Sequence, residues 1–254
     1  MTEQALHLVK VPLRPDKLVA VATRRQIRVR DLDDGYLVHC LLTELWQENA
    51  PAPFVLRGNG RTLDAWGYSR ADAATLVDHA RAFGDPSVTG VLGDIDAITS
   101  KEMPFLDEGR RVGFLTRVCP VARLSSATNG HRAGAEVDVF LAKCFSAAPD
   151  ASVSREAVYR EWFAERLRDV GATGARVACV RVAGMARTRI VRRTHATTRE
   201  AKALERPDVH LEGDLIIEDG RAFLDFLARG VGRHRAFGFG ALMLVPPGTS
   251  HGRS

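Results

Sequence analysis

The predicted secondary-structure elements occur twice in the same order along this chain, and this repetition constrains the fold more than any other feature. Hydrophobic periodicity predicts the order strand, helix, strand, strand, helix, strand at residues 5–12, 31–49, 53–56, 62–68, 70–83 and 88–92. The same order returns at residues 111–123, 155–170, 176–182, 210–217, 219–229 and 237–245. A β-α-β-β-α-β unit is the ferredoxin-like motif, so the chain is expected to contain two of them.

We therefore predict an α+β protein of two tandem ferredoxin-like (RRM-like) domains, residues 1–105 and 106–254, with a glycine-rich loop near the C-terminus. Three segments fall outside the repeated pattern. Residues 19–30 are expected to be extended or looped, and residues 128–151 to form a loop of unassigned conformation. Residues 186–206 are expected to be an excursion between two strands, whose later part can form a helical finger.

The composition indicates a reduced, cytoplasmic protein with a modest positive charge. The chain has 36 Lys and Arg against 31 Asp and Glu, which gives a formal net charge of +5. No apolar run of about 18 residues occurs, so we expect no membrane span. The cysteines are far apart and lack metal-ligand spacing, which is typical of buried thiols: Cys40, Cys119, Cys144 and Cys179.

A glycine-rich loop carrying cations lies just before the last predicted strand. Its glycines are Gly230, Gly232, Gly238 and Gly240. Glycine permits positive φ and close approach of another chain, and Arg233, His234 and Arg235 stand among these glycines. The order helix, loop, strand and the presence of Arg235 where a third glycine is required exclude the dinucleotide fingerprint. We predict that the loop from Gly232 to Gly240 binds a polyanion.

Two other segments are rich in arginine. The first precedes the first long helix and contains Arg24, Arg25, Arg28 and Arg30. The second carries seven positive charges: Arg187, Arg189, Arg192, Arg193, Arg199, Lys202 and Arg206. Guanidinium groups contact phosphates in bidentate fashion and stack on bases, with a strong salt dependence. One such run can be a solvated surface, but three basic elements in one chain favour nucleic acid.

Tyr36 and His39 are separated by three residues near the start of the first long helix, which places both on one helix face. Histidine titrates near neutral pH and can act as a general acid or base. The alternative is that His39 simply packs in the helix and that Tyr36 is a boundary aromatic. The acidic pairs Asp31/Asp33 and Asp94/Asp96 lack a further ligand, so we expect no metal site. RNA carries its own nucleophile, the 2′-hydroxyl, and then needs only a base, an acid and cations.

Three stretches resemble the CRISPR repeat-RNA endoribonucleases of the RAMP superfamily. The stretch GVGRHRAFGFGALML at 230–244 resembles their C-terminal glycine-rich loop. The stretch DLDDGYLVHCLL at 31–42 resembles the first helix of the CasE branch, and EGRRVGFLTRVCPVAR at 108–123 resembles the opening strand of its second domain.

The resemblance implies a metal- and cofactor-independent endoribonuclease that cleaves precursor CRISPR RNA at repeat stem-loops and stays bound to the mature crRNA, with other effector subunits as further partners. His39 is then the general base on the 2′-hydroxyl or the acid to the leaving 5′-oxygen, and Tyr36 orients the phosphate or assists proton transfer. The products would have 2′,3′-cyclic phosphate and 5′-hydroxyl ends. Dense arginines before the helix also fit a relative from another CRISPR subtype, in which Arg25 and Arg28 carry more of the catalysis.

Two alternatives stay open from the sequence. A non-catalytic RAMP subunit that binds guide RNA would share the fold and the basic loops, and only the Tyr36 and His39 pair speaks against it. A small-molecule enzyme could use the glycine-rich loop for a nucleotide phosphate, although the order of helix and loop is unfavourable.

Overall fold

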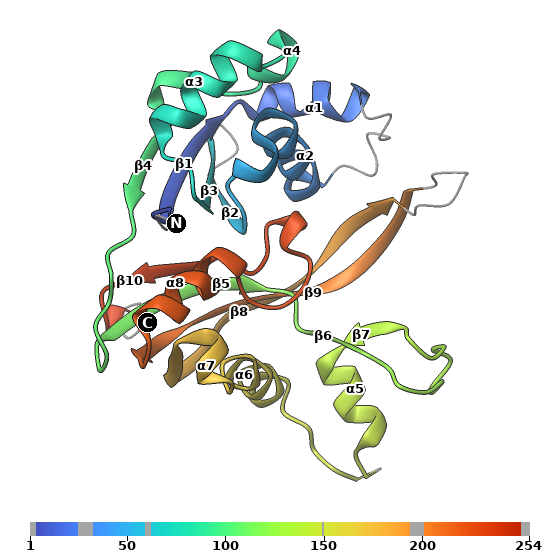
Figure 1. The fold of residues 1–254 in the computed structure, drawn as a ribbon. Helices are drawn as coiled ribbons and strands as arrows, with labels where there is room; N and C mark the ends of the chain where they lie inside the picture. The colour runs from blue at the N-terminus through green and yellow to red at the C-terminus, as the bar shows by residue number, and fades with distance from the viewer. Residues whose placement is uncertain (1–3, 25–32, 59–61, 149, 194–200, 250–254) are drawn as a thin grey trace.

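The computed structural model describes residues 4–24, 33–58, 62–148, 150–193 and 201–249, which form two stacked α+β parts (Figure 1). The first sheet has the strand order β2-β3-β1-β4 and is antiparallel throughout. Its strands are β1 (His7–Leu13), β2 (Phe54–Gly58), β3 (Leu63–Ser69) and β4 (Thr99–Glu102). The accompanying helices are α1 (Pro15–Arg24), α2 (Asp34–Trp46), α3 (Ala73–Phe83) and α4 (Pro86–Thr89), with short 3-10 turns η2 (Gln47–Asn49) and η3 (Ile95–Ala97).

The helices of the first part lie on the side of its sheet that faces away from the second part (Figure 1). Helix α2 begins where the Asp33 carboxylate accepts a hydrogen bond from the Tyr36 backbone N–H at 3.1 Å. Its buried face, which includes Leu37 and Leu41, belongs to the same apolar cluster as Val9 and Val11 of β1. Burial of this face fixes the rotation of α2 about its axis and therefore the direction of its remaining side chains.

The second sheet has the order β10-β5-β9-β8 and is also antiparallel. Its strands are β5 (Arg111–Val118), β8 (Ala175–Arg193), β9 (Ala201–Ile217) and β10 (Leu242–Val245). A separate two-stranded sheet consists of β6 (Val121–Arg123) and β7 (Glu136–Asp138). The helices are α5 (Val139–Ser146), α6 (Arg155–Arg166), α7 (Val170–Thr173) and α8 (Gly220–Arg229), with the 3-10 turn η4 (Arg235–Phe237).

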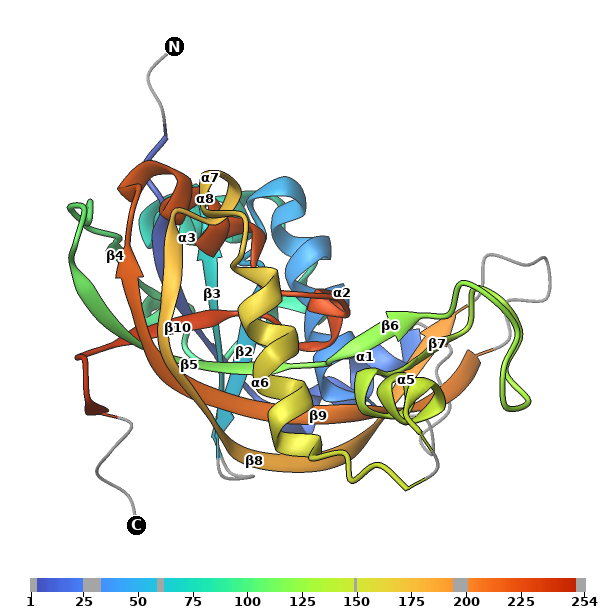
Figure 2. The same ribbon diagram turned by 90° about the horizontal axis from the view of Figure 1, so that it is seen from below.

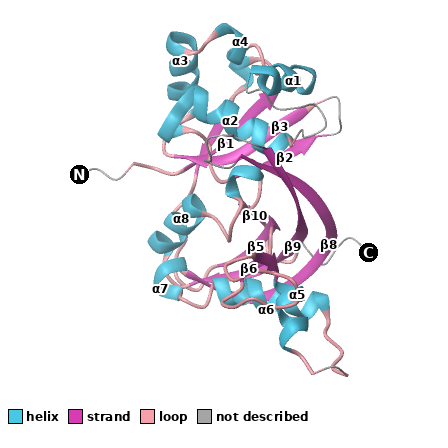
Figure 3. Ribbon diagram, turned by 90° about the vertical axis from the view of Figure 1, so that its right-hand side faces the viewer, coloured by secondary structure: helices cyan, strands magenta, loops and turns pink. Residues whose placement is uncertain are grey.

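Helix α6 crosses one face of the second sheet, as Figure 2 shows. Phe163 of α6 stacks on Phe114 of β5 with ring centroids 5.0 Å apart. Strands β8 and β9 are much longer than the other strands of the sheet and curve away from it as a hairpin (Figure 3). We call the part of this hairpin from Ala186 to Pro207 the hairpin arm.

Each sheet has the strand order and antiparallel pairing of a ferredoxin-like unit, so the predicted α+β class with two tandem ferredoxin-like units is confirmed. The domain boundary at residue 105 stays a prediction. It lies in the connection between β4 and β5.

Two predictions for the first part were wrong in detail. Residues 19–24, expected to be extended or looped, belong to helix α1. The strand expected at 88–92 is instead the end of α4 and the turn after it, and the edge strand is β4. Asp85 accepts a hydrogen bond from the Ser87 N–H, and Pro86 occupies the first turn of α4. These helix-start signals override the short apolar run Val88 to Leu92.

Two predictions for the second part also change. Residues 128–151, predicted to form a loop, contain β7 and α5. The arginine-rich excursion is not a helical finger in its described residues, because β8 continues to Arg193 and β9 begins at Ala201. The alternation of buried and exposed side chains along β8 explains why this strand continues into the arginine-rich segment. Ile190 is buried against Val121 and Phe239, whereas Arg187 on the opposite face is exposed.

The Tyr68 hydroxyl joins the two sheets. Tyr68 of β3 is buried in the apolar cluster of the second part, and its Oη donates a hydrogen bond to the Leu242 carbonyl of β10 at 2.6 Å. Burial also raises the pKa of Tyr68 above its usual range, so the hydroxyl stays a donor.

We expect Tyr68→Phe to lower the free energy of unfolding by about 1–2 kcal/mol, because the buried Leu242 carbonyl loses its partner from this side. Urea titration of wild type and variant measures this difference. A change smaller than about 0.3 kcal/mol would show that this hydrogen bond does not contribute to joining the sheets.

Candidate functional site

The start of helix α2 packs directly on the glycine-rich loop. A Cβ added at Gly35 would lie 2.3 Å from the Phe237 carbonyl oxygen, so glycine is required for this close approach. The Tyr36 ring stacks on the Phe237 ring, with centroids 5.6 Å apart and an interplanar angle of 23°. His234 lies on the other side of this contact network, with its ring centroid 5.8 Å from that of Phe237. The tertiary structure therefore brings together two motifs that are about 200 residues apart in the chain.

His39 lies one helical turn after Tyr36. Both side chains are half-buried, whereas their neighbours Leu37, Val38 and Cys40 are buried in the core of the first part. The pair thus lies at the border of the helix between the core and the surface. This position leaves the predicted chemical roles of Tyr36 and His39 open to experiment.

The glycine-rich loop has a positive φ angle at five of its residues. These angles are 71° at Gly230, 74° at Gly232, 62° at His234, 78° at Gly238 and 82° at Gly240. At Gly240, an added Cβ would also lie 2.4 Å from the Val231 carbonyl oxygen. A left-handed conformation is uncommon for residues other than glycine, and contacts of the His234 side chain help to hold it in place.

Glu136 of β7 supplies that contact. Its Oε2 lies 2.7 Å from His234 Nε2, and its Oε1 lies 2.7 Å from Arg233 Nε. Arg206 of β9 adds a longer ion pair at 3.6 Å. The hydrogen bond with His234, supported by the nearby positive charges, lowers the pKa of Glu136 to about 2 against the opposing effect of burial. Glu136 could not be identified from the sequence, because residues 128–151 show no periodicity that would place it on a strand.

Arg117 of β5 lies beneath the other half of the loop. Its guanidinium forms a bidentate pair with Asp208, at 2.9 and 2.6 Å, and lies 4.3 Å from the centre of the Phe239 ring. The Arg117 carbonyl accepts a hydrogen bond from the Gly240 N–H at 2.7 Å. This side chain therefore supports the loop from below. A lone arginine in a predicted strand gave no sequence signal for this function.

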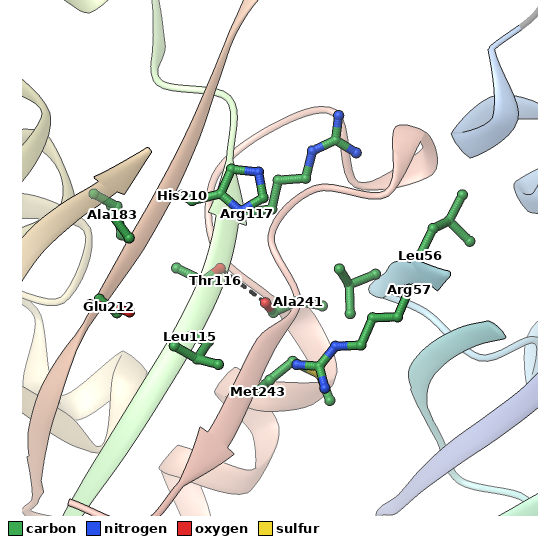
Figure 4. A pocket seen from close by; sticks show the side chains of 12 residues that line it. Leu56, Arg57, Leu115, Thr116, Arg117, Ala183, His210, Glu212, Ala241 and Met243 are labelled. Carbon is green, nitrogen blue, oxygen red and sulfur yellow. Dashed lines mark hydrogen bonds between the residues drawn. The ribbon is translucent and has the colours of Figure 1, made fainter. Parts of the chain in front are cut away.

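Arg117 lines two hollows. The first, of about 350 Å³, is lined by the start of α2, the hairpin arm and the loop, and includes Gly35, Arg117, Arg189 and Phe237. The second, of about 230 Å³, lies between the two sheets and is shown in Figure 4. Apolar side chains such as Leu115 and Met243 line it, and Arg57 and His210 also contribute to its wall.

The remaining predicted residues are distributed as follows. Arg187 lies on the exposed part of the hairpin arm, 3.4 Å from Glu205. Arg192, Arg193 and Lys202 belong by their backbone to the same arm, and Arg24 is the last residue of α1. Four predicted residues lie outside the described residues: Arg25, Arg28, Arg30 and Arg199. Arg235 differs from its two neighbours in the loop, since its guanidinium donates to the Arg229 carbonyl.

The described part of the chain holds no cluster of three or more His, Cys, Asp or Glu side chains placed to bind a metal ion. A search of the same residues finds no helix whose length and hydrophobicity would suit a membrane crossing.

Comparison with known proteins gives one family and a set of similar folds. The family model described as CRISPR associated protein matches residues 6–246. A search of curated proteins gave no match. Among solved structures, a CRISPR endoribonuclease Cse3 bound to a 19-nucleotide RNA has a TM-score of 0.61 and 24% identity, covering 95% of this chain and 100% of that chain.

Two further solved structures have the same fold. The CRISPR-associated protein Cas6e from Escherichia coli str. K-12 has a TM-score of 0.53 and 20% identity, covering 95% of this chain and 99% of that chain. A chain of a CRISPR RNA-guided surveillance complex has a TM-score of 0.53 and 18% identity, covering 94% and 99%. The similarity therefore extends over both sheets.

The low pKa of Glu136 predicts how the stability of the loop depends on pH. A lowered pKa means that the ionised form is favoured in the fold, so its contribution is present above the ordinary glutamate value and is lost as pH falls toward about 2. We expect Glu136→Gln to lower the free energy of unfolding by about 2 kcal/mol between pH 5 and 6. The difference from wild type should shrink as the pH is lowered below about 4.5.

Chemical denaturation at a series of pH values measures this difference, with Glu161→Gln as the control. Glu161 is exposed, and its ion pair with Lys143 is long, at 3.9 Å. Because such surface pairs contribute little, the free energy of unfolding of its variant should remain within about 0.5 kcal/mol of wild type. A pH-independent effect of Glu136→Gln would contradict the assigned role of the carboxylate charge.

Proposed function

We propose, because this chain belongs to the CRISPR-associated protein family, that it is an endoribonuclease that cuts precursor CRISPR RNA within the repeats. The fold similarity to Cse3 and Cas6e supports this assignment. The observation that carries it is the contact of the Tyr36 and His39 helix with the cationic glycine-rich loop. A titratable group beside a phosphate-binding element is the minimum that cleavage by the 2′-hydroxyl requires.

In the proposed reaction, the 2′-hydroxyl of the nucleotide before the cut attacks the adjacent phosphorus atom. The bond to the 5′-oxygen of the next nucleotide breaks, which leaves a 2′,3′-cyclic phosphate and a 5′-hydroxyl. His39 either takes the proton from the 2′-hydroxyl or gives one to the leaving oxygen. Tyr36, which is stacked on Phe237, donates a hydrogen bond to a phosphate oxygen.

The cations around this site are proposed to hold the RNA. Arg189 lines the hollow beside α2, and Arg187 extends the basic surface along the hairpin arm. A repeat stem-loop lying between the hairpin arm and the loop would place its phosphates next to these guanidinium groups. Mature crRNA and other subunits of a CRISPR effector complex are the partners that this function implies.

Cleavage of repeat RNA in the presence of a chelator tests the function. We expect wild-type protein to cut the repeat hairpin in EDTA, because the RNA supplies its own nucleophile and the proposed acid–base group is a side chain. A single 2′-deoxy nucleotide before the cut should abolish cleavage but leave binding unchanged. Tight binding of the unmodified hairpin without any cleavage would instead identify a non-catalytic RNA-binding subunit.

His39→Ala should slow single-turnover cleavage about a hundredfold or more, the usual effect of losing a general acid or base. Hairpin affinity should stay within about twofold of wild type. His79→Ala is the matched control, since His79 is also a half-buried histidine on a helix of the first part but lies on α3. If His39→Ala cuts as fast as His79→Ala, the arginines and not His39 are responsible for catalysis.

A further inference from the structure

A third hollow, distinct from the two described above, lies at the beginning of the glycine-rich loop and is lined by basic side chains. It measures about 490 Å³, and five arginines line it: Arg123, Arg166, Arg229, Arg233 and Arg235. We call this hollow the arginine basin. Its wall comes from β6, the end of α6, α7, the end of α8 and the loop from Gly230 to Arg235. By contrast, the end of the loop, at Phe237 and Phe239, lines the hollow beside α2.

Besides Arg233, which pairs with Glu136, three of these guanidinium groups are held in place by the protein. Arg229 donates to the Ala172 carbonyl at 2.5 Å, and Arg235 in turn donates to the Arg229 carbonyl. The Arg166 guanidinium lies 5.3 Å from the centre of the Trp162 ring. Arginines that are already ordered lose less side-chain entropy when they bind a ligand than solvated ones do.

The charges of the arginine basin are largely uncompensated within the described residues. Arg233 pairs with Glu136, but in the ranges that the structure describes Arg123, Arg166, Arg229 and Arg235 form no ion pair with a carboxylate. Asp169 is the acidic member of the lining, and its carboxylate accepts a hydrogen bond from the Ala172 N–H at 3.3 Å. In the described part of the chain, four arginines without an ion-pair partner face the one carboxylate of Asp169, and this excess of positive charge favours an anion in the hollow.

We propose that the arginine basin binds phosphates of a single-stranded RNA segment continuous with the RNA held at the glycine-rich loop. This inference rests on the proposed function. Arg233 and Arg235 belong to both the loop and the basin, so one RNA strand can pass from one to the other without leaving a cationic surface. A hollow of about 490 Å³ has room for part of a single strand, which can enter it more deeply than the outward-facing backbone of a duplex can.

Charge reversal at Arg123 and Arg166 tests the proposal, because both are exposed and neither belongs to the site at α2. The matched control reverses Arg160 and Arg168, two exposed arginines that pair with Glu156 and Glu165 outside the arginine basin. Fluorescence anisotropy measures the Kd for the bare repeat hairpin and for the same hairpin with a flank of about ten uridines, placed at each end in turn. Thermal melting confirms that both variants are folded.

We expect a uridine flank to strengthen binding by the wild-type protein and by the control. Of the two flanked hairpins, one will bind the wild-type protein more tightly. The Arg123→Glu/Arg166→Glu variant should bind that hairpin about tenfold more weakly than wild type does. For this variant, the slope of log Kd against the logarithm of the salt concentration should decrease by about 1. This decrease is expected for the loss of one or two single-strand phosphate contacts. Affinity for the bare hairpin should change less than twofold.

Three outcomes would overturn the proposal. Equal weakening for bare and flanked hairpins would place the stem in the arginine basin, and no weakening for either would remove the basin from the RNA surface. If uridine monophosphate competes with the flank as strongly as a uridine oligonucleotide does, the hollow is a site for a free nucleotide. Cleavage of the bare hairpin in EDTA is measured in a separate assay. Failure of the proposed endoribonuclease function can therefore be distinguished from failure of the proposed RNA binding by the arginine basin.

Discussion

The close approach of Gly35 to the Phe237 carbonyl is the contact on which the rest of the site depends. Because no side chain separates these backbones, the Tyr36 ring can stack on Phe237, and the start of α2 meets the glycine-rich loop. A substitution at Gly35 would push the loop away from the helix. The relative position of the titratable pair and the cations would then change, even though each half of the protein kept its own core.

Carboxylates fix side chains both in the glycine-rich loop and in the strand β5 that supports it. Glu136 binds His234 and Arg233, while Asp208 binds Arg117 in bidentate geometry. Without Glu136, the left-handed backbone at His234 would lose the side-chain contact that supports it. The result is a loop whose conformation is fixed by contacts within the protein, which would lower the entropic cost of the RNA binding proposed above.

The fold could be predicted from the sequence because the helix pattern and the strand pattern of each repeat depend only on residues close together in the chain. Apolar faces at helical spacing, as at Leu37 and Leu41, and alternating strands need no knowledge of distant residues. The wrong elements have local reasons too, since the capping by Asp85 and Pro86 outweighed the short apolar run after them. The family resemblance read from the loop and the first helix is confirmed by the match over residues 6–246. The chemical roles of Tyr36 and His39 stay predictions.

By itself, the sequence determined which side chains can carry charge, which segments repeat, and where glycine permits a positive φ. The tertiary structure alone decided that the start of α2 lies against η4, that Glu136 lies under His234, and that arginines from β6, α6, α8 and the loop surround one hollow. The physical reason is that the spacing of hydrophobic residues within one helix or strand indicates only which face of that element is buried. Ion pairs and backbone contacts between distant elements depend on how two sheets pack together, and no local pattern encodes that packing.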